Sequence, residues 1–349
     1  MRSGPFVALA VAAIVATACG GGTPAASPAV PTAATVATTA ASPTAKPLVK
    51  FSVGYASVSG TQAAAWVAKE KGIFQKNGLD VTLESIAGGS SPTAALLSDQ
   101  IQALQISVEA VSATLEGADI VYVAGPVSSP LFWFIAGPQI KTPADLKGQK
   151  IAATGVGTAT YFADILALRS FGLDLKDVQI ITTNNVPGIL AAVQSGQVAG
   201  GAVSMPTYSE AKKQGLKTLV NVADLGSKYP SSWLAVRRKT IETRRADVLA
   251  LVRSITEAIA FEIKDPAETQ RIIGIYTKTT DPALLKETYD TLVPYLNKVP
   301  TPKAEQVGTA LELIALDNPK AKGADPAKFV DPSFVQELEK AGFIDSLYR

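Results

Sequence analysis

The fold is decided by residues 49–86, which read VKFSVGYASVSGTQAAAWVAKEKGIFQKNGLDVTLESI. Apolar and polar residues alternate over 49–55 and again over 80–86, which predicts two strands. The alanine-rich stretch 62–71 between them predicts a helix that ends at Gly72. A strand, a helix and a second strand in this order favour a parallel βαβ unit.

The same pattern continues to residue 222 and falls into two sets. The first set adds a helix at 93–98 and strands at 103–107, 120–124 and 131–136. The second set has strands at 150–154, 178–183, 199–203 and 218–222, with helices at 159–171, 189–195 and 209–214 between them. We therefore expect an α/β protein of two similar lobes.

The chain is expected to enter the second lobe once and to return once. Residues 48–138 would form the first part of lobe 1, and residues 139–230 would form lobe 2. The stretch 233–236 would be the strand that crosses back, and residues 231–349, mostly helical after Thr243, would complete lobe 1. The two connections are expected near 136–141 and 228–233.

Residues 1–18 have the pattern of a secretory signal peptide. Arg2 is the only charge before an apolar run at 6–18, which as a helix would span only about 20 Å of a hydrocarbon core roughly 30 Å thick. Small residues precede Cys19, the only cysteine in the sequence, as in a bacterial lipobox. We expect Cys19 to be lipidated and to anchor the protein on the outer face of the cell membrane; the alternative is an incidental thiol in a cleaved signal.

Residues 19–47 are expected to form a disordered tether behind that lipid anchor. After Cys19 the segment consists mainly of Gly, Ala, Thr, Ser and Pro, and Lys46 is its only charged residue. Such a segment has no periodic apolar face to bury. A coil of this length reaches roughly 30 Å, so the folded part could leave the membrane surface and return to it.

Composition excludes several classes of function. The chain has 32 basic and 30 acidic residues, so it lacks the positive charge of a nucleic-acid-binding protein. It has no histidine, and its one cysteine lies ahead of the predicted lobes. Histidine-based catalytic triads, Cys/His zinc sites and disulfides are therefore excluded. We expect a non-enzymatic protein without a cofactor.

Three passages together resemble the SsuA/THI5-like (NMT1-type) solute-binding proteins. The first is WVAKEKGIF at 66–74, followed by GLDV at 78–81 and GGS at 88–90. The second is KTPADLKGQKIA at 141–152, and the third is LAAVQSGQV at 190–198. Ala199 replaces the aspartate usual in the family and Ser204 a common aromatic residue, so details on the ligand side differ.

This resemblance implies a type II periplasmic-binding-protein clamp, with two parallel-type sheets joined by two crossover strands. It also implies the function of such a clamp, which is to capture a small-molecule solute outside the cytoplasm and deliver it to the permease and ATPase subunits of an ABC importer. A monomer is expected. A eukaryotic branch of the family is enzymatic, but its chemistry needs histidine and cysteine that this chain lacks.

Open α/β sheets bind ligands at the carboxyl ends of their strands, beside the N-termini of helices. Six loops in this sequence have that position: 54–60, 87–92, 107–109, 154–161, 184–188 and 204–208. The ligand-binding residues that we expect from them are Tyr55, Ser57, Gly89, Ser90, Ser107, Glu109, Gly157, Thr158, Tyr161, Asn185 and Tyr208. The glycines of 155–160 and 88–91 could instead be plain turns or helix caps.

The chemistry of these loops favours a flat heterocycle over an anion. They contain no Arg or Lys, which sulfonate, nitrate or phosphate sites usually recruit. Tyr55, Tyr161 and Tyr208 could stack on a ring while Asn185 reads its edge. Within the resembling family this points to riboflavin, bound by RibY-type lipoproteins, ahead of the thiamine pyrimidine precursor. Sulfonate-type anions and a solute sensor without a transport role stay open.

Overall fold

The first sheet is made of strands that are far apart in the sequence. They are β1 (Val49–Tyr55), β2 (Leu79–Ser85), β3 (Ala103–Ile106), β4 (Ile120–Val127) and β10 (Ser232–Arg237). Their order in the sheet is β2–β1–β3–β10–β4, and β1 runs parallel to β2 and β3. These features come from a computed structural model, which describes residues 47–349 except Gly89.

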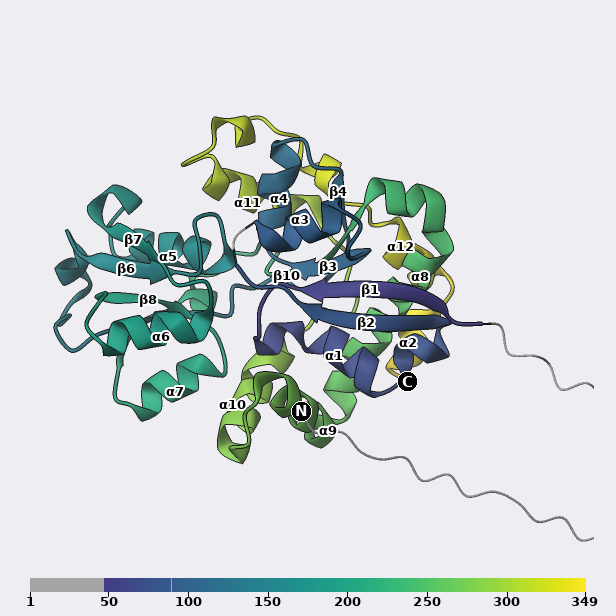
Figure 1. The fold of residues 1–349 in the computed structure, drawn as a ribbon, viewed down its shortest axis with the longest axis horizontal. Helices are drawn as coiled ribbons and strands as arrows, with labels where there is room; N and C mark the ends of the chain where they lie inside the picture. Colours follow the sequence, from purple (N-terminus) through teal and green to yellow (C-terminus); the bar gives the residue numbers. More distant parts are fainter. Residues whose placement is uncertain (1–46, 89) are drawn as a thin grey trace, which may run out of the picture. The chain divides into compact units, whose positions relative to one another are not determined.

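The second sheet repeats the plan of the first. Its strands are β5 (Trp133–Ala136), β6 (Lys150–Ala153), β7 (Gln179–Thr182), β8 (Gly200–Val203) and β9 (Lys217–Asn221). Their order is β7–β6–β8–β5–β9. We call the first sheet with its helices lobe 1 and the second sheet with its helices lobe 2 (Figure 1). The expected two-lobed α/β clamp is confirmed.

Two expectations need correction. The sheets are mixed rather than purely parallel, because β10 runs antiparallel to β3 and β4, and β5 runs antiparallel to β8 and β9. The antiparallel strand in each lobe is the one that follows a change of lobe. The first change lies between β4 and β5, at residues 128–132, and not at 136–141, because β5 pairs with the second sheet.

Helices flank both sheets, as βαβ units require. In lobe 1 they are α1 (Ala63–Glu70), α2 (Ile73–Lys76), α3 (Ser91–Leu97) and α4 (Glu109–Leu115). In lobe 2 they are α5 (Ala159–Ser170), α6 (Val186–Gln194) and α7 (Thr207–Lys213). Helix α4 was not expected from the sequence, so Glu109 begins a helix and does not end a loop. Single 3-10 turns fill the connections: η1 (Gly60–Gln62), η2 (Pro143–Leu146), η3 (Leu175–Asp177) and η4 (Val222–Leu225).

The C-terminal part returns to lobe 1 as a run of helices. They are α8 (Arg238–Lys264), α9 (Pro266–Thr277), α10 (Pro282–Leu292), α11 (Ala304–Ile314), α12 (Ser333–Lys340) and α13 (Phe343–Leu347), with turns η5 (Val293–Tyr295), η6 (Pro319–Ala321) and η7 (Pro326–Phe329). Helix α8 packs on α1, an alanine-rich helix whose residues 63–68 are all buried. Val248, Leu251 and Ile255 of α8 join Phe51 and Val53 of β1 in one buried cluster. Figure 1 shows these helices, in green and yellow, gathered around the first sheet.

In residues 47–349 no helix combines the length and the apolar composition needed to span a membrane. The expected signal peptide, the lipidated Cys19 and almost all of the tether lie outside the described residues.

Candidate functional site

A cavity of about 470 Å³ lies between the two lobes, with walls from both. This volume is within the usual range for small-molecule sites. The strands β1, β3, β6, β7 and β8 end beside it, because the residues that follow each of them line the cavity. The lining is Ala56, Ser57, Val58, Ser59, Thr61, Gln62, Ala87, Gly88, Pro92, Ser107, Glu109, Phe132, Thr154, Thr158, Ala159, Thr160, Asn184, Asn185, Val186, Pro187, Ser204, Ser231, Tyr276, Thr277 and Lys278.

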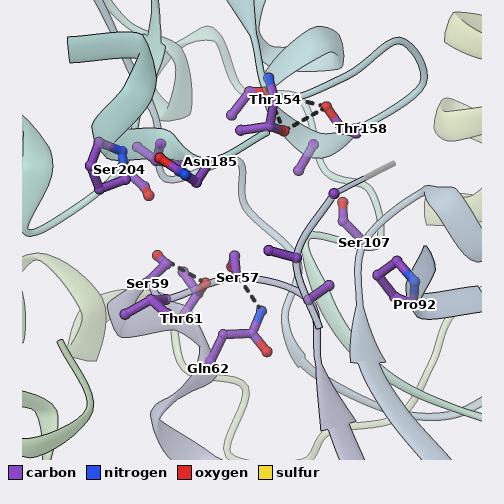
Figure 2. A pocket seen from close by; sticks show the side chains of 18 of the residues that line it. Ser57, Ser59, Thr61, Gln62, Pro92, Ser107, Thr154, Thr158, Asn185 and Ser204 are labelled. Atoms are coloured by element: carbon purple, nitrogen blue, oxygen red, sulfur yellow. Dashed lines mark hydrogen bonds between the residues drawn. The ribbon is translucent and has the colours of Figure 1, made fainter. Parts of the chain in front are cut away.

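On the lobe 1 side, hydroxyl and amide groups follow β1. Figure 2 shows Ser57, Ser59, Thr61 and Gln62 grouped on one side of the cavity. The Gln62 amide nitrogen donates to the Ser57 hydroxyl over 3.4 Å, and the Thr61 hydroxyl donates to the Ser59 hydroxyl over 3.3 Å. Both contacts are long for hydrogen bonds, so a ligand can compete for these groups at modest cost.

On the lobe 2 side, a threonine cluster shapes the loop between β6 and α5. The Thr154 hydroxyl donates to that of Thr158 over 2.9 Å (Figure 2), and the Thr158 hydroxyl donates to the Gly155 carbonyl over 2.7 Å. At the next strand end, the Asn185 side-chain oxygen accepts from the Gly188 N–H over 2.8 Å and caps α6. This cap does not use the amide nitrogen of Asn185.

Glu109 joins the two lobes at the cavity wall. Its Oε1 accepts a hydrogen bond from the backbone N–H of Ala159, at the start of α5, over 3.1 Å. Burial raises the pKa of Glu109 to about 7, although the nearby backbone N–H groups of Glu109, Ala159 and Ser107 oppose the shift. The carboxyl group is therefore about half ionised at neutral pH.

Other contacts between the lobes flank the cavity. Lys212 and Lys213 of α7 form ion pairs with Glu287 and Asp281 beside or within α10. Elsewhere, the Tyr161 hydroxyl on α5 donates to the carboxylate of Asp317, after α11. The lobes thus enclose the cavity in a closed arrangement.

Five of the expected site residues line this cavity: Ser57, Ser107, Glu109, Thr158 and Asn185. They follow β1, β3, β6 and β7, as the rule for strand ends predicts. Gly89 lies outside the described residues.

The expected tyrosine platforms are not in the lining. Tyr208 stacks on Trp133 with 4.4 Å between ring centroids, and Tyr55 packs edge-on against Trp66 at 5.6 Å. The Tyr161 hydroxyl donates a hydrogen bond to the Asp317 carboxylate. All three side chains are buried in packing contacts. Ser90 and Gly157 also lie outside the lining: Ser90 is exposed, and Gly157 adopts a left-handed turn with φ of 76°.

Several lining residues were missed by the sequence analysis. The aromatic side chains at the cavity are Phe132, in the first connection between lobes, and Tyr276, at the end of α9. Thr277 and Lys278 accompany Tyr276, and Ser231 lies in the second connection. The polar stretch around Gln62, just ahead of an apolar helix, could have indicated this part of the cavity lining from the sequence. No local signal marks 276–278, because the position of α9 at the cavity depends on its packing against α1 and α10.

The described residues contain no group of three or more Cys, His, Asp or Glu side chains arranged to hold a metal ion. The cavity chemistry is instead that of hydroxyls, amides and one carboxyl group. This arrangement can hold a polar organic molecule by hydrogen bonds and contact with two aromatic rings.

Comparison with solved structures agrees with the two-lobed fold. A Bordetella bronchiseptica protein superposes with a TM-score of 0.74 at 23% identity, covering 84% of this chain and 98% of that one. The alkanesulfonate-binding protein SsuA from Xanthomonas axonopodis gives 0.68 at 20% identity, covering 82% and 99%. The periplasmic nitrate-binding protein NrtA from Synechocystis gives 0.68 at 14% identity, covering 84% and 89%.

Sequence comparison gives the family. A Haemophilus influenzae protein named for thiamine biosynthesis is 30% identical over 130 residues, 36% of this chain and 41% of that protein, so the match spans about two fifths of the relative. A Brucella abortus protein named as a binding protein is 28% identical over 232 residues, covering 65% of this chain and 71% of the relative. The model of the family described as NMT1/THI5 like matches residues 61–269. Because that match covers more than half of the 349 residues, the chain belongs to the NMT1/THI5-like family.

Proposed function

We propose that this protein is the extracytoplasmic solute-binding component of an ABC importer. The observation that carries the proposal is the cavity between the lobes, which is walled by the carboxyl ends of strands from both sheets. A clamp of this kind encloses a solute by moving two rigid lobes about their connections. The solved proteins of this fold that are named as periplasmic sulfonate-binding and nitrate-binding proteins support the same role.

The solute that fits the lining best is a small uncharged or weakly basic polar molecule. Among the described lining residues, the charged side chains are Glu109, in the wall, and Lys278, which is exposed. Sulfonate and nitrate sites usually recruit arginine or several converging donors. An acidic group without an arginine disfavours those anions. Phe132 and Tyr276 offer the aromatic contact that the sequence had predicted for three other residues, Tyr55, Tyr161 and Tyr208.

Riboflavin is our first candidate, and the thiamine pyrimidine precursor is the second. The Haemophilus influenzae relative named for thiamine biosynthesis supports the second. Sulfonate-type anions form the third option. We also propose that the protein is a monomer, that it is not an enzyme, and that it is held at the outer face of the cell membrane by a lipid on Cys19. The tether at 19–47 would then let it reach the permease.

The test is to titrate the purified protein with riboflavin, a hydroxymethylpyrimidine, taurine and nitrate, by calorimetry and, for riboflavin, by fluorescence. A true solute at a hundredfold excess over Kd stabilises the folded state by about 2.7 kcal/mol and raises Tm. Solution scattering on solute-free protein should show a smaller radius of gyration when the solute is added. Tight binding without compaction in a protein that is open when empty would contradict the clamp.

A solute sensor is the competing function. A sensor would bind the same solute but would not deliver it to a permease. Uptake of the identified solute should fall in a strain that lacks the protein; unchanged uptake would favour the sensor.

A further inference from the structure

The two carboxylate oxygens of Glu109 have different surroundings. Oε1 accepts from the Ala159 N–H, 3.1 Å away in the other lobe. Oε2 is buried and has no hydrogen-bond partner among the described residues. Glu109 also lines the cavity. A buried carboxylate oxygen without a donor costs free energy. The backbone N–H groups of Glu109 and Ser107 lie near this carboxylate but form no hydrogen bond with Oε2, so its acceptor capacity is unused within the described part of the chain.

The titratable groups around Glu109 do not supply that donor. The Tyr122 hydroxyl donates to the Ser107 carbonyl instead. Tyr229 is fully buried and close enough for the charge of Glu109 to help raise its pKa, but its hydroxyl has no hydrogen-bond partner within 47–349. Burial raises the pKa of Asp164, which favours its neutral form, and its Oδ1 accepts from the Ala202 N–H. Lys278 lines the same cavity but is exposed and forms no ion pair with Glu109.

We propose that Glu109 determines specificity by binding a basic nitrogen of the solute, such as an amine or an amino-substituted heterocycle. The inference rests on the proposed function and narrows its solute class to molecules with a basic nitrogen, a group that riboflavin lacks. An N–H donor at Oε2 satisfies the buried oxygen, and a cation there forms a charge-assisted hydrogen bond. An anion meets the uncompensated negative charge of an ionised Glu109. A basic solute at Glu109 also favours closure of the two lobes, because the ionised carboxylate is a better acceptor than the acid for the Ala159 N–H.

Binding of a basic solute should be linked to loss of a proton from Glu109. Burial places the pKa of this carboxyl group at about 7, so it is largely protonated at pH 6 and largely ionised at pH 8. A cationic solute binds the ionised form. Its affinity should therefore be about tenfold higher at pH 8 than at pH 6, and binding near pH 7 should release a fraction of a proton.

The experiment compares the wild type with Glu109→Gln and Glu116→Gln. The amide introduced by Glu109→Gln keeps an oxygen for the Ala159 N–H but cannot hold a negative charge. Glu116, at the end of the same helix, bonds Asn318 and Lys320 outside the cavity and serves as the matched control. The probes are pairs that differ only in the basic group: 4-amino-5-hydroxymethylpyrimidine and its analogue with hydrogen at position 4, benzylamine and benzyl alcohol, with riboflavin and taurine added.

The amino member of a pair should raise Tm in the wild type and in Glu116→Gln. In Glu109→Gln it should bind at least about 30-fold more weakly, which corresponds to losing one partner of a buried charge pair. Calorimetry in two buffers of different ionisation heat should detect the proton released by the wild type. If an amino probe binds and compacts Glu109→Gln as well as the wild type, or if the binding of benzylamine, which stays cationic, does not change between pH 6 and 8, the Glu109 inference is wrong and the proposed function stands. If no probe changes Tm or compaction, both are overturned.

Discussion

The stability of the solute-free protein should depend on pH through Glu109. Its folded-state pKa is about 7, against an ordinary value of 4.5. Because the folded-state pKa is raised, the contribution of Glu109 to stability is fully present below pH 4.5 and is lost as the pH rises through 7. One pKa unit corresponds to 1.36 kcal/mol, so the loss is at most about 3 kcal/mol. Part of the side chain faces the cavity, which makes this figure an upper bound.

The perturbation is Glu109→Gln, which removes the titration and keeps an oxygen for the Ala159 N–H. Denaturant unfolding at pH 4.5, 5.5, 6.5 and 7.5 should show the variant gaining stability over the wild type as the pH rises, with the difference levelling off above pH 7. Buried Asp164 and Glu262 also have raised pKa values, but both proteins contain them, so their effect cancels in the difference.

The control for this experiment is Glu116→Gln. Hydrogen bonds from Lys320 and Asn318 lower the pKa of Glu116, so its contribution is present above pH 4.5 and is lost only as the pH falls below that value. Its difference from the wild type should stay flat from pH 5 to 8. Parallel pH profiles for the wild type and Glu109→Gln would refute the reasoning, and would mean that water reaches the carboxyl group freely.

Three further predictions concern closure, packing and anchoring. Glu287→Lys removes the ion pair with Lys212 between α7 and α10 and should weaken solute binding about fivefold at low salt and less at 1 M salt, since exposed pairs are worth up to about 1 kcal/mol. Lys286→Glu is the control, because its pair with Asp290 lies within α10. Equal solute affinities of the wild type and Glu287→Lys would contradict a role of the ion pair in closure. Gly201→Ala should destabilise by about 1 to 3 kcal/mol in denaturant unfolding, because its new Cβ would lie 2.4 Å from the Ala152 carbonyl oxygen. Gly308→Ala in helix α11, whose new Cβ would lie 3.7 Å from Pro326 Cγ, should be neutral or gain up to about 1 kcal/mol. A similar loss in both variants would argue against the clash. Cys19→Ser should move the protein from the membrane to the soluble fraction without changing its Tm, and retention on membranes after a salt wash would exclude a lipid on Cys19.

Much of the fold could be read from local patterns. Alternation over 49–55 and 80–86 around an alanine-rich helix determines a βαβ unit, because each period of apolar residues fits one type of element. The second set of strands and helices, starting at Lys150, identified the second lobe in the same way. The rule that ligands lie at the carboxyl ends of strands then selected Ser57, Ser107 and Thr158, which the structure does place at the cavity.

The direction of the crossing strands was beyond local patterns. A short apolar stretch such as 133–136 pairs equally well with either sheet and in either direction. Its place between β8 and β9 depends on which edges are available once both lobes have formed.

The choice among side chains was also decided by tertiary packing. Tyr55 and Tyr208 lie within the expected loops 54–60 and 204–208, but each ring packs against an aromatic partner in the core, Trp66 and Trp133 respectively. Tyr276 and Lys278 reach the cavity from a helix more than 200 residues after β1, because α9 packs on α1. By itself the sequence determined the family, the two lobes and the strand ends that meet at the cavity. Only the tertiary structure decided which rings face it and that Glu109 spans both lobes, since these depend on contacts between segments far apart in the chain.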